Sequence, residues 1–129
     1  MQLLESGIID KKWWGIVVYE IVGNGCLIGS WAINNKINFE DDSRRFRNEI
    51  ARKKSELPEL KLNYEVVGEY TVSYIEPDGS AFSGTLSITE NTNNGTYKLY
   101  WNIKDGDEHI GVGMKTGEKQ LTVIYWAAK

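Results

Sequence analysis

The chain has 129 residues, which is a typical length for one domain and too short for two. Fifteen Lys and Arg residues stand against eighteen Asp and Glu residues, so the formal net charge is −3 and no broad basic field predicts nucleic-acid binding. One cysteine, Cys26, excludes an internal disulfide, and one histidine, His109, excludes a histidine cluster. We therefore expect neither a metal nor a cofactor.

The N-terminal region gives no sign of export or membrane insertion. Residues 1–7 lack the basic and long apolar regions of a secretory signal. The longest apolar run, near residues 13–19, is far too short to span a bilayer. If Met1 is the natural start, these features predict a cytoplasmic protein without membrane contacts. A signal peptide removed earlier would leave the same sequence.

Segments in which apolar and polar residues alternate recur along the chain, as is typical of half-buried antiparallel strands. In the clearest of them, Tyr97, Leu99, Trp101 and Ile103 share one face. Another alternates Ile110, Val112 and Met114 with two glycines, and we expect its bulky residues to face the interior. In chain order the alternating segments are 70–74, 82–89, 97–103, 110–114 and 121–125.

Short turn signals separate these segments. Asn-Gly and Asp-Gly pairs readily adopt the positive φ angles of tight hairpin turns. They predict an up-and-down meander, which avoids open edges by closing into a barrel. We expect one mainly β domain over residues 1–129, an antiparallel barrel of about eight strands. The predicted turns are Asn24-Gly25, Asp78-Gly79, Asn94-Gly95, Asp105-Gly106 and Thr116-Gly117.

Residues 38–60 interrupt the alternation and are highly charged. Acidic residues precede basic ones, and Glu40–Arg44 and Glu49–Lys53 are i,i+4 pairs of the favourable orientation. A thin apolar stripe would let a helix rest on the barrel without being buried. We therefore expect a helix over residues 42–56, in a peripheral insertion whose replacement by a Gly-rich turn leaves a folded barrel. The stripe residues are Phe46, Ile50 and Leu57.

Four motifs in the second half of the chain resemble a known family. Residues 68–72 read GEYTV, 77–88 read PDGSAFSGTLSI, 97–103 read YKLYWNI and 111–113 read GVG. Together they resemble a bacterial family of small β-barrels, calycin-like or avidin-like, whose members are often labelled fibronectin-binding protein. The resemblance covers residues 68–126, implies a barrel fold, and brings no catalytic motif.

The resemblance also implies a particular strand pairing. Residues 14–21 read WGIVVYEI and 27–31 read LIGSW, and both resemble a later part of the same family. Here they precede the other motifs, which implies a circular permutation. We therefore expect the segment near 16–21 to pair with the one near 121–125. That pairing can form within a monomer or between the chains of a homodimer.

Aromatic residues are the main candidates for a binding site, since the chain holds five Trp and seven Tyr. Alternate residues of every strand line a small barrel, where large side chains either fill the interior or orient one small ligand. We expect Leu86 and Met114 to join this lining. The candidate ligand-binding residues are Tyr19, Trp31, Tyr70, Tyr74, Tyr97, Trp101 and Tyr125.

These features favour a non-enzymatic binding module for a small apolar ligand. Acidic residues on or beside strands leave a second interpretation open, an enzyme with carboxylates in the barrel mouth, although no spacing selects two of them. A third is an inhibitor or immunity-type protein that binds a protein partner through its outer face and basic helix. The acidic residues are Glu20, Glu65, Glu69 and Glu76.

Overall fold

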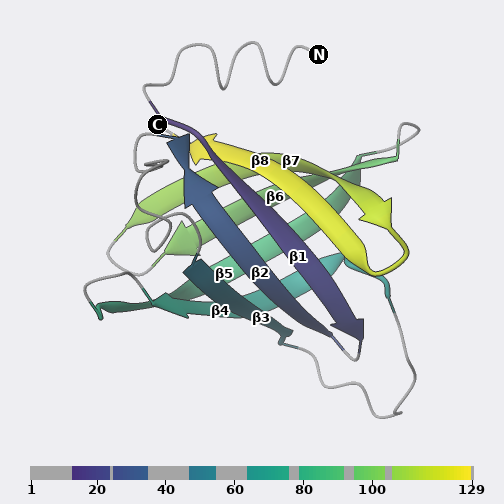
Figure 1. The fold of residues 1–129 in the computed structure, drawn as a ribbon, viewed down its shortest axis with the longest axis horizontal. Coiled ribbons are helices and arrows are strands. Elements are labelled where there is room, and N and C mark those ends of the chain that lie inside the picture. Colours follow the sequence, from purple (N-terminus) through teal and green to yellow (C-terminus); the bar gives the residue numbers. More distant parts are fainter. Residues whose placement is uncertain are drawn as a thin grey trace, which may run out of the picture.

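The computed structural model describes residues 13–23, 25–34, 47–54, 64–75, 79–91, 95–103 and 106–128. They form a closed barrel of antiparallel strands, in which each strand pairs with its neighbours along the chain (Figure 1). The predicted mainly β barrel is confirmed. Its eight strands are β1 Gly15–Gly23, β2 Cys26–Ile33, β3 Arg47–Lys53, β4 Gly68–Ile75, β5 Ala81–Asn91, β6 Thr96–Ile103, β7 Asp107–Gly117 and β8 Gln120–Ala127.

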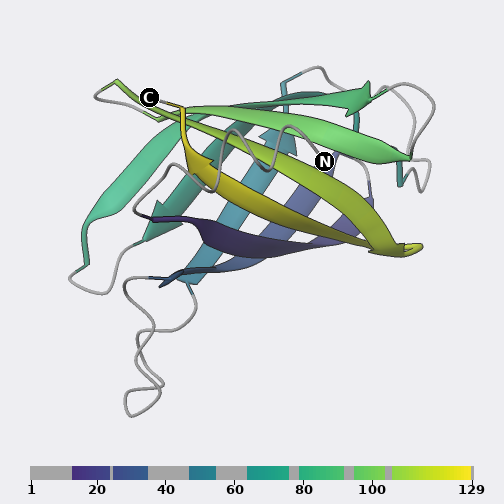
Figure 2. The same cartoon turned by 90° about the horizontal axis from the view of Figure 1, so that it is seen from above.

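The first and last strands close the barrel. In β1 and β8, Ile16 lies opposite Ile124 and Val18 lies opposite Thr122, in an antiparallel register that runs from Gly15 to Glu20. Figure 2 shows the two strands side by side along one wall of the barrel. The predicted pairing of 16–21 with 121–125 is therefore confirmed, and it forms within one chain.

Strand β3 corrects the predicted helix over residues 42–56. Residues 47–53 are a strand that pairs with both β2 and β4, so that Ile50 lies opposite Ile28 on one side and Ser73 on the other. The i,i+4 charge pairs are compatible with a helix, but they are weak local interactions. The backbone groups of β2 and β4 need a strand between them to be paired. Residues 38–46 and 55–60 of the predicted insertion lie outside the described residues.

This correction reverses the expectation for replacing residues 38–60 by a short Gly-rich turn. The replacement removes β3 and both of its hydrogen-bonded ladders, which leaves β2 and β4 as open edges. We expect the shortened chain to lose its cooperative unfolding transition in urea and to aggregate. Circular dichroism and urea titration test this. A sharp transition with the β signal of the intact chain would contradict the role given to β3.

Strand β7 corrects the expected orientation of residues 110–114. Gly111 and Gly113 face the interior, whereas Met114 is 53% exposed. A Cβ atom on Gly111 would lie only 3.1 Å from Cζ3 of Trp101 and 2.8 Å from the carbonyl oxygen of Ile124. Glycine is thus needed where the large Trp101 side chain fills the barrel. The bulky residues of β7 face outward because the side-chain period of a strand is two.

One end of the barrel is plugged by residues 64–67, which precede β4. Val66 is fully buried in the core cluster, and its carbonyl oxygen accepts a hydrogen bond of 2.7 Å from the Tyr70 hydroxyl. The Lys115 ammonium donates to the carbonyl oxygen of Tyr64 at 2.9 Å, and the Lys53 ammonium donates to that of Glu65 at 3.1 Å. Side chains therefore fill this end and hold the segment in place.

Candidate functional site

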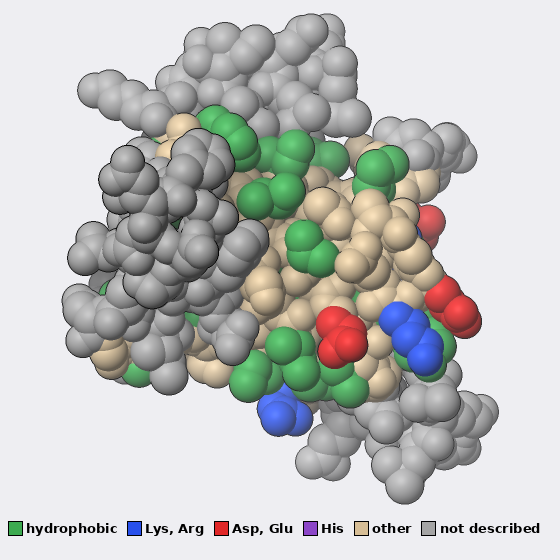
Figure 3. All heavy atoms as spheres, viewed as in Figure 1, with side chains coloured by type: hydrophobic (Ala, Val, Ile, Leu, Met, Phe, Trp, Pro, Cys, Tyr) green, Lys and Arg blue, Asp and Glu red, His purple; other side chains and the backbone are tan. Residues whose placement is uncertain are grey.

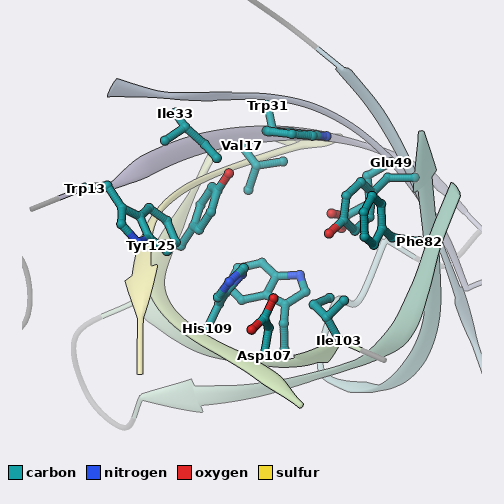
Figure 4. Close-up of a pocket in the computed structure, with 12 residues that line it drawn as sticks. Trp13, Val17, Trp31, Ile33, Glu49, Phe82, Ile103, Asp107, His109 and Tyr125 are labelled. Atoms are coloured by element: carbon teal, nitrogen blue, oxygen red, sulfur yellow. The ribbon is translucent and has the colours of Figure 1, made fainter. Parts of the chain in front are cut away.

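A pocket of about 220 Å³ lies at the opposite end of the barrel, where β1 begins and β2 ends (Figure 4). Each of the eight strands contributes at least one side chain, so the closure of the barrel assembles the whole lining. The lining residues are Trp13, Val17, Trp31, Ile33, Glu49, Tyr74, Phe82, Trp101, Ile103, Asp107, His109 and Tyr125.

One side of the pocket is an aromatic wall built from β2, β4 and β5. The rings of Trp31 and Tyr74 meet edge to face with centroids 5.6 Å apart. The rings of Tyr74 and Phe82 are stacked at 5.2 Å. We call these three residues the β2–β5 wall. Such contacts fix the ring orientations, since each aromatic pair contributes about 0.5–1.5 kcal/mol beyond burial.

The opposite side is a second aromatic wall. The Tyr125 ring lies 5.4 Å from that of Trp101 and stacks on the His109 ring at 6.0 Å. Trp13, just before β1, meets His109 edge to face at 5.2 Å. We call these four residues the β6–β8 wall. In Figure 4, Trp13 and Tyr125 lie across the pocket from Phe82 and Glu49, with open space between them.

Glu49 is a buried acid in this mainly apolar pocket. Its side chain is 8% exposed and accepts a hydrogen bond from the hydroxyl of Tyr19. Burial raises the pKa of Glu49 to about 7, although hydrogen bonds from Tyr19 and Trp101 act in the opposite direction. Burial and the neighbouring carboxylate raise the pKa of Tyr19 well above its ordinary value. Tyr19 therefore remains a donor, while Glu49 exchanges a proton near neutral pH.

The indole N–H of Trp31 is a second polar group in the pocket. Trp31 is 8% exposed, and its Nε1 atom has no hydrogen-bond partner among the described residues. A buried donor without a partner costs about 1–3 kcal/mol. In Figure 4 this nitrogen lies at the end of the ring nearer to Glu49. An acceptor atom placed in the pocket would satisfy it.

His109 and Asp107, both from β7, form part of the pocket rim. Burial lowers the pKa of His109 below its ordinary value of 6.5, and the charge of Asp107 opposes this shift. His109 is therefore mainly neutral at neutral pH. Within the described part of the chain, the lining contains no Lys and no Arg. Among the described lining residues, Glu49 and Asp107 are thus the charged groups that a ligand would meet.

The described residues give no sign of a metal centre or of a membrane-spanning helix. They contain no cluster of three or more His, Cys, Asp or Glu side chains suited to hold a metal ion. No helix among them has the length and apolar character needed to cross a bilayer.

Four of the seven candidate lining residues from the sequence come together in the pocket: Trp31, Tyr74, Trp101 and Tyr125. Tyr19 lies on the interior face of β1 and donates to Glu49. Tyr70 and Tyr97 belong to the plugged end, because they lie near the start of β4 and of β6, whereas the pocket is at the end of these strands. Leu86 is buried in the core.

Sequence reasoning missed Glu49, the central polar residue, because it assigned this position to a helix. The signal was a short alternation in which Glu49 and Ala51 face inward while Ile50 and Arg52 are exposed. This alternation does not predict a strand clearly, because a charged residue faces inward and an isoleucine faces outward.

The carboxylates selected from the sequence do not form the site. Glu20 and Glu69 are exposed on β1 and β4, and Glu65 lies at the plugged end, where its Oε1 atom accepts hydrogen bonds from the backbone N–H groups of Val66 and Val67. Glu76 lies outside the described residues.

Comparisons of the chain with protein-family models, with curated proteins and with solved structures find no significant match. The resemblance to the bacterial barrel family therefore stays a prediction, as does the circular permutation that it implies.

Proposed function

We propose that the barrel binds a small organic molecule in the pocket, between the β2–β5 and β6–β8 walls. The observation that carries the proposal is the convergence of two ordered aromatic clusters on one open volume, with a buried carboxyl group and an unpartnered N–H beside it. Apolar walls with a few oriented polar groups are typical of ligand sites.

The size of the pocket limits the ligand. An apolar cavity of about 150 Å³ is known to hold benzene. A pocket of about 220 Å³ has room for a single ring with a short substituent. It is smaller than the range of roughly 300–1,000 Å³ typical of sites for drug-sized molecules. The proposed ligand is therefore a compact, monocyclic molecule.

The composition of the pocket supports binding over simple filling of the barrel. Side chains fill the plugged end, where Val66, Leu99 and Leu121 are fully buried. At the open end the chain keeps a buried acid without a basic neighbour among the described lining residues. Desolvation makes such a group costly for stability, and costly buried acids are concentrated at functional sites.

Ile33→Trp tests the proposal by filling the pocket. Ile33 is half-buried at the end of β2, so we expect the larger ring to enter the mouth without unfolding the barrel. Saturation-transfer NMR with phenol, benzyl alcohol and benzylamine should detect binding to the natural chain. In the variant, the affinity for these compounds should be at least tenfold lower. Ile28→Trp places the same residue on the outer face of β2 and should retain binding. Equal signals from all three proteins would contradict the proposal.

Acid–base catalysis is a second candidate function, favoured by the pKa of about 7 at Glu49, since such a group can both donate and accept a proton at neutral pH. A compound that binds should then be converted over time, and Glu49→Gln should stop the conversion. Mass spectrometry of the incubated compound separates catalysis from binding, because a pure binding protein returns the compound unchanged.

The protein-partner alternative has less support. Its basic helix is replaced by strand β3 over residues 47–53. In Figure 3, the hydrophobic side chains on the part of the β1 and β2 face that the described residues form lie in small separate groups rather than in one large patch. The exposed large apolar residues are Trp14, Val22, Ile28, Ile50, Val67 and Met114.

A further inference from the structure

Among the described lining residues of the pocket, the charged groups all have one sign. Glu49 lies deep in the pocket and Asp107 lies at its rim, while the described lining residues include no Lys and no Arg. His109 is held mainly neutral at neutral pH by burial. Among these described residues, a bound anion would therefore meet carboxylates and no cation. A bound cation would meet one or two opposite charges.

The aromatic walls also favour positive charge. The face of an aromatic ring carries partial negative charge and attracts a cation that lies within about 6 Å of its centroid. The indole rings of Trp31 and Trp101 belong to opposite walls and both line the pocket. Tryptophan is the strongest of the aromatic partners for a cation. A cation between the two walls thus interacts with rings on both sides.

Glu49 provides the anchor for such a cation. Tyr19 from β1 donates a hydrogen bond to its carboxyl, and the other described titratable groups that line the same pocket are Tyr74 from β4, Asp107 and His109 from β7, and Tyr125 from β8. In its ionised form Glu49 can accept a charge-assisted hydrogen bond from an ammonium group. Burial, which makes the isolated carboxylate unfavourable, also makes its pairing with a cation strong.

The free N–H of Trp31 adds a second requirement. It needs an acceptor, and no described residue supplies one. An ammonium group has no acceptor atom, so the charged nitrogen cannot satisfy Trp31 itself. An oxygen atom of the ligand, a few bonds from its charged nitrogen, can accept the hydrogen bond from Trp31. We infer that the ligand is a small arylalkyl amine, with an aromatic ring and an alkyl ammonium group, that binds as a cation against Glu49 and carries an acceptor oxygen for Trp31.

This inference rests on the proposed function, and three probes of matched size separate the two. We expect 2-phenylethylamine to bind at least tenfold more tightly than 2-phenylethanol at pH 8, and phenylacetate to bind weakest. Isothermal titration calorimetry measures all three. Absence of binding by every probe would overturn the proposed function together with the inference. Binding of the neutral or anionic probe as tightly as the amine would overturn the cation inference and leave the pocket as a binding site.

Substitutions test whether Glu49 causes the expected preference of the pocket for a cationic ligand. Glu49→Gln should reduce the affinity for 2-phenylethylamine at least tenfold and change that for 2-phenylethanol little. Glu20→Gln removes the same charge from the exposed face of β1 and should leave both affinities unchanged. The amine should bind the natural chain more tightly as the pH rises through about 7, because Glu49 must first lose its proton. A pH profile shared by the natural chain and Glu49→Gln would contradict this assignment.

The acceptor oxygen is tested by 2-amino-1-phenylethanol, which adds one hydroxyl to 2-phenylethylamine. We expect this hydroxyl to increase the affinity of the natural chain about fivefold or more, because it pairs with the free N–H of Trp31. Trp31→Phe keeps an aromatic ring and removes the donor, so the two amines should bind it equally. A hydroxyl that adds nothing in the natural chain would overturn the part of the inference that concerns Trp31.

Discussion

Glu49→Gln should make the protein more stable above pH 7 and remove a large part of its pH dependence. The pKa of the Glu49 carboxyl is about 7 in the folded barrel, against 4.5 for its ordinary value. Between these two pH values the folded chain holds a proton that the unfolded chain has released. The stabilisation from this proton is therefore complete below about pH 4.5 and is lost as the pH rises through about 7. Its size is roughly 3 kcal/mol, from about 1.4 kcal/mol per pH unit.

The measurement is the free energy of unfolding in urea at pH 5, 6, 7 and 8. Glutamine stays neutral and can still accept the hydrogen bond from Tyr19. The variant should exceed the stability of the natural chain by less than about 1 kcal/mol at pH 5 and by roughly 3 kcal/mol at pH 8. His109 contributes the opposite slope to both proteins, since its pKa is lowered, and this contribution cancels in the difference. Parallel curves for the two proteins would contradict a protonated, buried Glu49.

Most of the fold was predictable because most strands and turns carry their own signal, with β3 as the exception. In the two hairpin turns around Gly25 and Gly106, φ is 78° and 92°, the region that the Asn-Gly and Asp-Gly pairs predict. The alternation around Trp101 likewise holds in the structure, where Leu99, Trp101 and Ile103 are buried. Local chemistry specifies these elements, and the closure of the barrel follows from their order.

The site was harder to predict because it depends on contacts between distant residues. The pKa of Glu49 is shifted by burial and by Tyr19, which lies 30 positions away in the sequence. The need for glycine at position 111 depends on the space taken by Trp101, which lies on another strand. Neither effect has a signature within a short window of sequence. The aromatic lining was found in part, since bulky residues alternate within single strands.

Trp101→Ala should cause the largest loss of stability among the pocket variants. Trp101 is 3% exposed, packs against the Tyr125 ring at 5.4 Å, and lies on the inner face of β6. Truncation of a buried Trp side chain to Ala typically costs about 3–5 kcal/mol, because the lost contacts leave a cavity. The neighbouring Gly111 cannot fill the space, since it has no side chain. We therefore expect a loss within this range.

Urea unfolding monitored by circular dichroism at pH 6 measures the loss for Trp101→Ala and for a matched control. Trp14→Ala removes the same side chain from a position that is 37% exposed, so it should cost clearly less than Trp101→Ala. Trp101→Phe keeps a ring in the cavity and should fall between the two. The indole of Trp101 also donates a hydrogen bond that lowers the pKa of Glu49, so both Trp101 variants should raise this pKa further. Equal stabilities of Trp101→Ala and Trp14→Ala would place Trp101 outside the core and contradict the geometry of the pocket.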